Sequence, residues 1–365
     1  MIRRAFLERE GGKGNGNGNG DEGGEEERKK IFLQALKQGE IVHIEDDWFG
    51  QTFGLGFLKD YLKIEGLEEI IIHHPRQSEI VTSFEQKLTD MDLDEGLWNW
   101  VVSYLCLKEG IPFNLGRPFA SFMLPFSKVN IRGSFIHQEA LPTPFHKAFF
   151  RILPASFFPL EDFSKRDVGF LLEAVDQKKN ILVSGATGSG KTSLLKTLFH
   201  HCAKKRHHII TVEDTHELQH DFPWVTSLIA KEHPQYAMEQ YLTYAMRMRP
   251  ERIVLGEIRS KEIVPLLLAL NCGHGGLLST VHANSAQEAL HRLALLFQLY
   301  GPSTLSHEVT MSLLCQNIDI TIHIEARQIA QVIHVLGHDK GRPIFDDLLS
   351  PAQDQAKTPV TPLFM

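Results

Sequence analysis

The sequence predicts an α/β fold with two domains, in which a smaller α/β domain precedes a larger one built on a parallel sheet. Three observations support this prediction. From about residue 165 onward, short apolar segments alternate with longer amphipathic ones, the pattern of a parallel sheet with helices on both faces. Residues 29–150 mix helix and strand signals, and a Pro- and Phe-rich stretch at 141–163 follows them. The 365 residues suffice for two compact domains and tails.

These signals divide the chain into five segments. Residues 11–27 are rich in Gly, Asn and Glu, and such a composition buries too little apolar surface to offset its ordering entropy. A disordered tail is therefore expected at 1–28. The segments that follow are an N-terminal α/β domain at 29–150, a linker at 151–164, a C-terminal domain at 165–350 and a flexible tail at 351–365.

Composition narrows the class of protein. The net charge of −7 argues against a dedicated nucleic-acid binder, because such proteins usually carry a basic domain. No apolar run approaches the roughly 18 residues of a transmembrane helix, and the N-terminus lacks the apolar segment of a signal peptide.

The histidine-rich segment HHCAKKRHH at 200–208 is either a zinc site or a polar helix end. The cysteines form no CxxC pair, as expected in a reducing compartment; they are Cys106, Cys202, Cys272 and Cys315.

The N-terminal domain is expected to contain three helices and a strand that leads into a turn. RKKIFLQALKQG has helical spacing up to Gly39, and LKDYLK predicts a short helix. LEEIIIHH predicts a strand that ends in a turn at Pro75. DEGLWNWVVSYLCLKEG predicts a helix that ends at Gly110, with one apolar face formed by Leu97, Trp100, Val101, Tyr104 and Leu105.

The C-terminal domain is expected to repeat the order strand, loop, helix. The predicted strands are NILVSG, HIITVED, RIVLGE and LLSTVHA. The predicted helices between them are SLLKTLFHHCA, AMEQYLTYAMRM and EIVPLLLALNCG.

The segment GATGSGKT at 185–192 fits the phosphate-binding pattern G-x-x-x-x-G-K-[ST], and it lies between a predicted strand and a predicted helix. Its glycines allow the backbone to fold around phosphate oxygens, while N–H groups and the helix N-terminus face the anion. Lys191 is expected to reach the β- and γ-phosphates, and Thr192 to bind Mg²⁺. The predicted nucleotide-binding residues of this loop are Gly185, Ala186, Thr187, Gly188, Ser189, Gly190, Lys191 and Thr192.

Two later strands end in carboxylates. RIVLGEIR predicts an apolar strand that delivers Glu257 to the Mg²⁺ side of a nucleotide, the alternative being a strand that ends in a surface acid. ITVEDTHEL ends its strand with Glu213 and Asp214, which strand alternation places on opposite sides. One of these carboxylates is expected to orient and deprotonate the attacking water, whereas Asp214 or Thr215 is a candidate cap for a following helix.

Arginines and a histidine complete the set of candidates. Arginine pairs with phosphate in bidentate fashion and stabilises the charge that develops during phosphoryl transfer. At least two of the four arginines near the second acidic strand are expected to form structural ion pairs instead; the four are Arg247, Arg249, Arg252 and Arg259. His282, in GHGGLLSTVHANS, follows an apolar strand. Spacing alone leaves it either a nucleotide contact or a structural side chain.

Four motifs stand in order along the chain: GATGSGKT, TVEDTHEL, RMRPERIVLGEIR and GHGGLLSTVHANSAQEALHRL. In that order they resemble the Walker A loop, acidic box, atypical Walker B and histidine box of the ATPases of type II secretion, type IV pili and type IV secretion. The residues of these motifs are most similar to those of the branch that includes the Tad/Flp pilus motor, and the resemblance covers about residues 165–325. It implies a RecA-like P-loop motor domain behind a smaller α/β N-terminal domain.

The resemblance also implies roles for single residues. Glu213 corresponds to the general base, Glu257 to the acid on the Mg²⁺ side and His282 to a γ-phosphate contact. Arg247 and Arg259 match positions of inter-subunit arginines.

One part of the N-terminal domain departs from the family. GIPFNLGRPFASFMLPFSKVN resembles a segment in which the family places two arginines that reach the γ-phosphate, but Met123 and Lys128 stand at the matching positions. Arg117, Arg132 or Arg151 is a candidate replacement. The two chosen as nucleotide-binding residues are Arg132 and Arg151.

The resemblance implies a Mg²⁺-dependent ATPase that forms a homohexamer, with nucleotide between the two domains of each chain. It would drive pilus assembly or protein secretion from the cytoplasmic face of a bacterial inner membrane, as a peripheral partner of integral platform proteins and without direct nucleic-acid contact. Two alternatives remain. One is a RecA-like nucleic-acid motor, which the acidic net charge opposes. The other is a catalytically weak interaction subunit of a secretion complex.

Overall fold

The computed structural model describes residues 4–5, 41–42, 58, 60–91, 93, 95–126, 129–153, 158–166, 168–230, 237–302 and 305–349. The chain divides into two compact units, Met1–Pro154 and Ala155–Met365. The two-residue strands β1 (Arg4–Ala5) and β2 (Ile41–Val42) pair in parallel. Apart from residues 4–5, the tail predicted at 1–28 lies outside the described residues, as do the helix predicted at 28–39 and the tail at 351–365.

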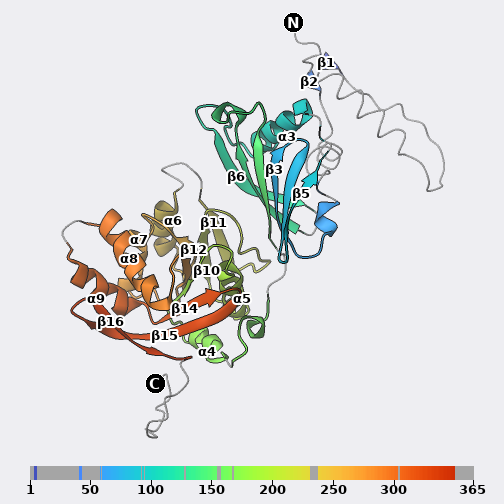
Figure 1. Cartoon of the computed structure of the whole chain (residues 1–365). Helices are drawn as coiled ribbons and strands as arrows, with labels where there is room; N and C mark the ends of the chain where they lie inside the picture. The colour runs from blue at the N-terminus through green and yellow to red at the C-terminus, as the bar shows by residue number, and fades with distance from the viewer. Residues whose placement is uncertain are drawn as a thin grey trace, which may run out of the picture. The chain divides into compact units, whose positions relative to one another are not determined.

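Unit 1 is built on a six-stranded antiparallel sheet with the order β5-β4-β3-β8-β7-β6 (Figure 1). One long helix, α3, contributes side chains to the same apolar core as the strands. The strands are β3 (Leu67–His74), β4 (Gln77–Thr82), β5 (Gln86–Asp90), β6 (Phe119–Phe126), β7 (Val129–Ile136) and β8 (Lys147–Leu153). The helices are α3 (Glu95–Lys108) and the short 3-10 segments η3 (Tyr61–Lys63) and η4 (Gln138–Ala140).

The buried face of α3 differs from the predicted one. Val101 and Leu105 are buried as expected, and Trp98 is buried with them. The Trp98 indole donates a hydrogen bond of 2.7 Å to the His146 carbonyl, which ties this side of the helix to the segment before β8. Trp100 and Tyr104 are partly buried and stack on each other with ring centres 5.2 Å apart. Leu97, Trp100 and Tyr104 are only partly buried but pack against this core, so the predicted face is confirmed in part and Trp98, Val102 and Cys106 extend it.

Unit 2 contains an eight-stranded sheet with the order β11-β10-β12-β13-β9-β14-β15-β16. The pairs from β11 to β14 are parallel, as predicted, and β15 and β16 extend the sheet in antiparallel fashion. The strands are β9 (Ile181–Ser184), β10 (Ile209–Glu213), β11 (Val225–Ile229), β12 (Arg252–Ile258), β13 (Leu278–Val281), β14 (Ile320–Glu325), β15 (Gln328–Asp339) and β16 (Arg342–Asp347).

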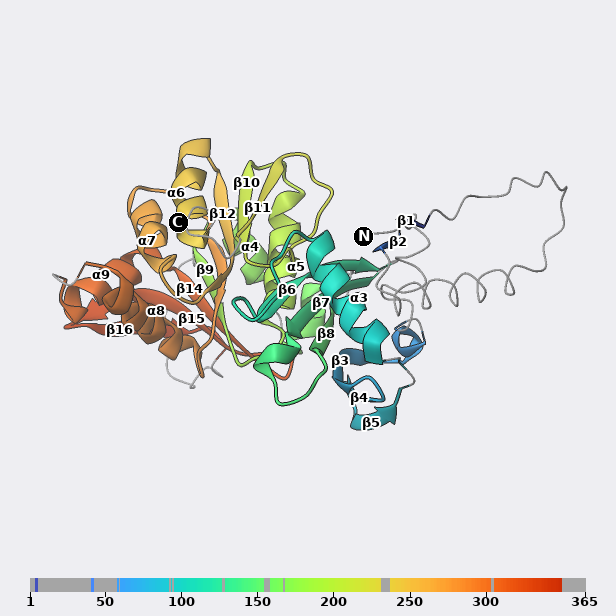
Figure 2. The ribbon, with the colours of Figure 1, turned by 90° about the horizontal axis from the view of Figure 1, so that it is seen from above.

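Helices cover both faces of this sheet (Figures 1 and 2). Successive strand residues point to opposite sides, so that Leu182 packs with α6 to α9 while Ile181 and Val183 pack with α4 and α5. The helices are α4 (Phe170–Asp176), α5 (Lys191–Ala203), α6 (Met238–Ala245), α7 (Ile263–Asn271), α8 (Ala286–Tyr300) and α9 (His307–Asn317), with the 3-10 segments η5 (Leu160–Phe163) and η7 (Met246–Met248).

The parallel pairing decides where a site can form. The carboxyl ends of β9, β10, β12, β13 and β14 point to the same edge of the sheet, so the loops after these strands gather there. The described part of the chain contains no helix with both the length and the apolar character of a membrane-spanning segment.

Candidate active site

The loop at 185–192 connects β9 to α5 as the motif predicted. Gly190 occupies the N-cap of α5 with φ 101°, a left-handed conformation that favours glycine. At Gly185 an added methyl group would lie 2.5 Å from the Ile324 carbonyl oxygen, so only glycine fits there. Ala186, Thr187 and Gly188 are exposed. The loop therefore rests on β14 and presents its tip to solvent above a 13-residue helix.

Lys191 starts α5 and lies at the centre of the site. Its side chain is buried, and Nζ donates a 2.7 Å hydrogen bond to the Ala186 carbonyl. The same Nζ lies 3.4 Å from Nδ1 of His282, which follows β13. Thr192 is partly buried at the next position. The phosphate-binding loop and the predicted histidine thus meet directly, although 91 residues separate them in the sequence.

A chain of charged contacts continues from His282. Its Nε2 lies 2.9 Å from Glu257 Oε1, without the alignment of a hydrogen bond. Glu257 Oε2 accepts a hydrogen bond of 2.7 Å from Arg259, and Arg259 also donates to Asp214 at 2.6 Å. Lys191, His282, Glu257, Arg259 and Asp214 therefore form one connected cluster drawn from the ends of four strands.

This cluster shifts the protonation of its members. Burial lowers the pKa of His282, and the charge of Lys191 acts in the same direction, whereas the Glu257 carboxylate raises it. His282 therefore favours the neutral form at pH 7, in which one ring nitrogen donates and the other accepts. Burial opposes the charge of Arg259, but its bonds to Glu257 and Asp214 outweigh burial and hold its pKa above the ordinary value.

Glu213, at the end of β10, has a different environment. It is 2% exposed, and its Oε1 accepts hydrogen bonds of 3.0 Å from the backbone N–H groups of Glu217 and Leu218. Its Oε2 is buried and has no hydrogen-bond partner among the described residues. Burial raises the pKa of Glu213 to about 8 against these two N–H donors.

The loop after β10 corrects one prediction. No helix follows Thr215, because residues 214–220 form an irregular loop. The Glu213 carboxylate accepts from the Glu217 and Leu218 N–H groups, and the Thr215 carbonyl, not its side chain, also accepts from Glu217 at 2.7 Å. Asp214 is exposed and belongs to the Arg259 ion pair. The two carboxylates do point to different surroundings, as the strand alternation predicted.

The other arginines of this region lie apart from the cluster. Arg247 is an exposed residue of η7, and among the described residues none of its contacts reaches Glu257 or His282. Arg252 is 1% exposed and donates to the Val175 carbonyl and to His207 Nδ1. Arg249 is exposed with φ 55°. Arg252 is thus a structural residue, as expected for part of this set.

Arg132 and Arg151 belong to unit 1 and are direct cross-strand partners on β7 and β8. Met123 on β6 pairs with Arg132, so the three positions lie in one row across the sheet. Directly opposed residues share a face, which makes the two arginines neighbours on one side of the sheet. Arg151 is exposed, while Arg132 is partly buried with Nε 3.4 Å from Ser121 Oγ. Lys128 lies outside the described residues.

Sequence reasoning did not predict two features of unit 2 near the cluster. Glu262 is buried and accepts hydrogen bonds from the backbone N–H groups of Arg259 and Ser260, which fixes the chain just after Glu257. Its position three residues after Arg259 is the only sequence signal for this role.

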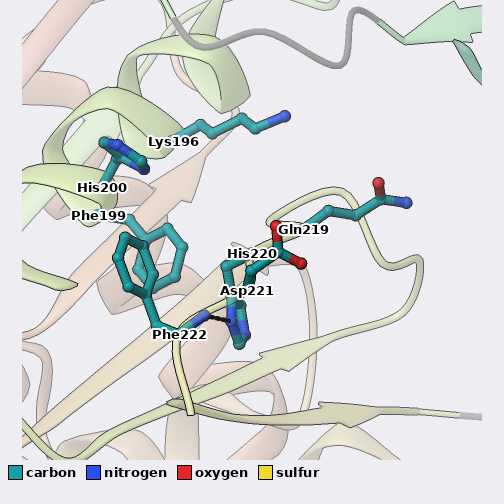
Figure 3. Close-up of a pocket in the computed structure, with 7 residues that line it drawn as sticks. All are labelled: Lys196, Phe199, His200, Gln219, His220, Asp221 and Phe222. Atoms are coloured by element: carbon teal, nitrogen blue, oxygen red, sulfur yellow. Dashed lines mark hydrogen bonds between the residues drawn. The ribbon is translucent and has the colours of Figure 1, made fainter. Parts of the chain in front are cut away.

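The second unpredicted feature is a cavity of about 320 Å³ along α5 (Figure 3). It is lined by Lys196, Phe199, His200, Gln219, His220, Asp221 and Phe222, and none of the predicted site residues is among them. Burial lowers the pKa of Lys196, whereas the charges of Glu213 and Glu217 raise it, so the cavity adjoins the Glu213 loop.

The histidines of HHCAKKRHH make structural contacts. His201 pairs with Asp176 at 2.9 Å, and His207 Nδ1 accepts from Arg252 at 3.3 Å. Among the residues that the structure describes, no group of three or more His, Cys, Asp or Glu side chains is arranged to hold a metal ion. A Mg²⁺ site built from one or two carboxylates, a hydroxyl and substrate phosphates does not need such a group.

The sequence matches the family described as type II/IV secretion system protein over residues 140–324, just over half of the 365 residues. The chain belongs to this family. The match spans the phosphate-binding loop, both acidic strands and His282, which are the parts of unit 2 that form the cluster described above.

Curated relatives of this family come from conjugation and secretion systems. The conjugal transfer protein TrbB of Rhizobium radiobacter is 32% identical over 192 residues, which are 49% of this chain and 57% of TrbB. The type IV secretion system protein VirB11 of Bartonella quintana is 38% identical over 166 residues, 44% of this chain and 46% of VirB11. The chain thus spans about half the length of these relatives. Neither match separates the Tad/Flp branch from the others, so that finer assignment stays a prediction.

Solved structures resemble the fold over a larger part of the chain. The pilus retraction motor PilT with bound ADP covers 80% of this chain and 81% of its own, with a TM-score of 0.56 and 20% identity. The Legionella pneumophila ATPase DotB covers 79% and 77%, with a TM-score of 0.52 and 16% identity. Likenesses at such identity concern the fold, and they confirm the predicted class, an N-terminal α/β domain before a RecA-like domain.

Proposed function

We propose that this chain hydrolyses ATP in the presence of Mg²⁺ and acts as a motor subunit for protein secretion or pilus assembly. One observation carries the proposal. A phosphate-binding loop, a histidine and two acidic side chains from separate strands gather at one edge of a parallel sheet, with Lys191 3.4 Å from His282 and His282 2.9 Å from Glu257. Phosphoryl transfer needs such convergence, since its catalysis is mainly positioning and electrostatic stabilisation.

The loop and α5 supply the binding step. The N–H groups at 188–192 and the N-terminus of the 13-residue helix α5 suit the β- and γ-phosphates of ATP, and Lys191 adds a positive charge. Thr192 and Glu257 offer the hard oxygen ligands that Mg²⁺ prefers, and the buried Glu257 Oε1 has no aligned hydrogen bond within the described chain. Bound Mg²⁺ would neutralise charge on the phosphate oxygens.

The two acids are assigned different roles because their surroundings differ. Glu257 lies between His282 and Arg259, and it accepts a charge-assisted hydrogen bond from Arg259. Glu213 is buried, its pKa is raised to about 8, and the Glu217 and Leu218 N–H groups fix its orientation. A group with a pKa near the working pH suits a general base, so Glu213 is assigned the attacking water and Glu257 the metal side.

The assembly is proposed on family membership. A ring of six chains would place arginines of one subunit at the nucleotide of the next, and the exposed Arg247 is free of the Glu257 cluster for such a role. Arg259 is held within its own chain by Asp214 and Glu257, so a contact across subunits would require these ion pairs to open. Arg132 and Arg151 are the proposed contacts from unit 1. Integral inner-membrane platform proteins are the proposed partners, with the motor peripheral at the cytoplasmic face.

The test is ATP turnover by the purified full-length chain with and without Mg²⁺. Lys191→Ala should abolish turnover, while Lys205→Ala, which removes an exposed lysine just beyond the C-terminal end of the same helix, should not. Glu213→Gln should bind ATP without hydrolysing it. Retained turnover in Lys191→Ala refutes the phosphate-loop assignment, and stimulation by DNA would favour a nucleic-acid motor. Analytical ultracentrifugation with and without nucleotide tests the hexamer.

A further inference from the structure

The hairpin between β14 and β15 packs directly against the phosphate-binding loop. The Arg327 N–H, in the turn of this hairpin, donates a 3.0 Å hydrogen bond to the Ser189 carbonyl. A methyl group on Gly185 would touch the Ile324 carbonyl at 2.5 Å, and one on Gly190 would lie 3.4 Å from Arg327 Cα. The turn therefore forms one wall of the phosphate-binding loop, although about 140 residues separate them in the sequence.

The side chain of Arg327 begins beside the phosphate-binding loop. Its Cγ would lie 3.5 Å from a methyl group on Gly190, so the side chain starts at the loop residue just before Lys191. The residue is exposed. Because the sheet order is β12-β13-β9-β14, Glu257 and His282 lie on one side of the loop and Arg327 lies on the other. Arg327 is thus on the opposite flank from the groups assigned to the γ-phosphate.

The turn keeps this arginine at a conformational cost. Ala326 and Arg327 have φ values of 46° and 63°, a left-handed region that non-glycine residues enter at a cost in free energy. The next hairpin turn, between β15 and β16, has the same backbone type but places glycine second, in Lys340–Gly341 with φ 46° and 79°. The first turn therefore retains a guanidinium where glycine would relieve the strain.

We propose that Arg327 binds the nucleotide on its α-phosphate and ribose side. This assignment rests on the proposed ATPase function and adds a contact that neither the motifs nor the family match provides. A guanidinium offers planar N–H donors that suit phosphate oxygens, and it keeps its charge at every physiological pH. Since ATP and ADP share the α-phosphate and ribose, the contact is the same for both.

The expected effect follows from that placement. Arg327→Ala should weaken binding of ADP and of a non-hydrolysable ATP analogue by about the same factor, on the order of tenfold for one exposed charge-assisted contact. In turnover assays KM should rise while kcat at saturation stays within about twofold. His282→Ala should instead weaken the ATP analogue more than ADP. Arg327→Lys should recover part of the affinity because it keeps the charge.

The decisive experiment is titration calorimetry of the full-length chain with ADP and with the ATP analogue. Lys340→Ala is the matched control, since it removes a cation from the same turn geometry at the opposite end of the 12-residue strand β15. Arg327→Gly separates binding from folding: its Tm should not fall, because glycine suits φ 63°, yet its nucleotide affinity should drop as in Arg327→Ala.

Two results would overturn the assignment in different ways. If the Arg327 variants bind ADP as tightly as wild type while Lys191→Ala does not, the role of Arg327 is refuted and the proposed function stands. If wild type binds neither nucleotide, the proposed function fails and the assignment fails with it.

Discussion

Replacing Glu213 by Gln should make unit 2 more stable at neutral pH while removing catalysis. The carboxyl group has an ordinary pKa of 4.5, and burial raises it to about 8 in the folded chain. Between these two values the native state keeps a proton that the unfolded state has released. The free energy of unfolding therefore falls as pH rises through this window. Below pH 4.5 Glu213 has no effect on it, and above pH 8 the destabilisation by Glu213 is complete. A Gln side chain carries no such penalty.

The size of the effect follows from the same two values. Within the window each pH unit changes stability by about 1.4 kcal/mol, so raising the pH from about 5.5 to about 7.5 should cost wild type about 3 kcal/mol at this group. Other titrating groups are common to both proteins and cancel in the comparison. The Gln carbonyl can still accept the N–H bonds of Glu217 and Leu218, so the variant should resemble protonated wild type at pH 5.5.

The assay is hydrogen exchange of the full-length chain, read at the amides of β10 and α5, whose slowest openings report unfolding of unit 2. The free-energy difference between Glu213→Gln and wild type should grow by about 3 kcal/mol from pH 5.5 to pH 7.5. Glu288→Gln, which removes an exposed carboxylate in the first turn of α8, should show no comparable growth. An equal difference at both pH values would show that Glu213 is ionised in the native chain and would refute the reasoning.

Two further predictions concern catalysis and the turn before β13. If Glu213 is the base, kcat should rise with pH, with a midpoint near 8. Glu217→Gln should lower that midpoint because the Glu217 charge raises the pKa of Glu213. A flat pH profile, or a midpoint that Glu217→Gln does not move, would exclude this role. Gly276→Ala should destabilise unit 2 by about 2 kcal/mol more than Gly273→Ala, as measured by urea unfolding. Both glycines have positive φ, but only at Gly276 would a methyl group lie 2.9 Å from Arg252 Nη1. Equal losses in the free energy of unfolding for the two variants would contradict this account.

The sequence predicted four strands of unit 2, β9, β10, β12 and β13, but not β14, although five of its six residues are buried. β9, β10 and β12 are almost wholly buried, so each is a continuous apolar run that local pattern can identify. β11 and β16 were not predicted, because they lie at the two edges of the sheet and most of their residues are partly or fully exposed. Edge strands carry polar side chains that hide the apolar alternation. The antiparallel pairing of β14, β15 and β16 depends on contacts that spacing alone does not reveal.

The residues of the candidate site that lie in local sequence motifs could be predicted. Lys191, Glu257 and His282 were each singled out from a local pattern, and the fold places them in contact. The contacts of Asp214 and Arg327 with the residues of this region were not predicted. The contact of Asp214 with Arg259 spans 45 residues, and that of Arg327 with Ser189 spans about 140. Both require the order of the strands, which no single motif contains.

The different environments of the two acids follow from where their strands end. β10 and β12 are neighbours, and both deliver an acid to the same edge of the sheet. Glu213 is the last residue of its strand, and the loop after it folds back so that its N–H groups and side chains enclose the carboxylate. Glu257 is followed by Arg259, whose backbone Glu262 holds, and it faces His282 from β13. Burial raises the pKa of Glu213, whose Oε2 has no hydrogen-bond partner in the described chain, whereas Glu257 is paired with Arg259. Neighbouring strands thus place two glutamates in different surroundings at one edge of the sheet without any difference in residue type.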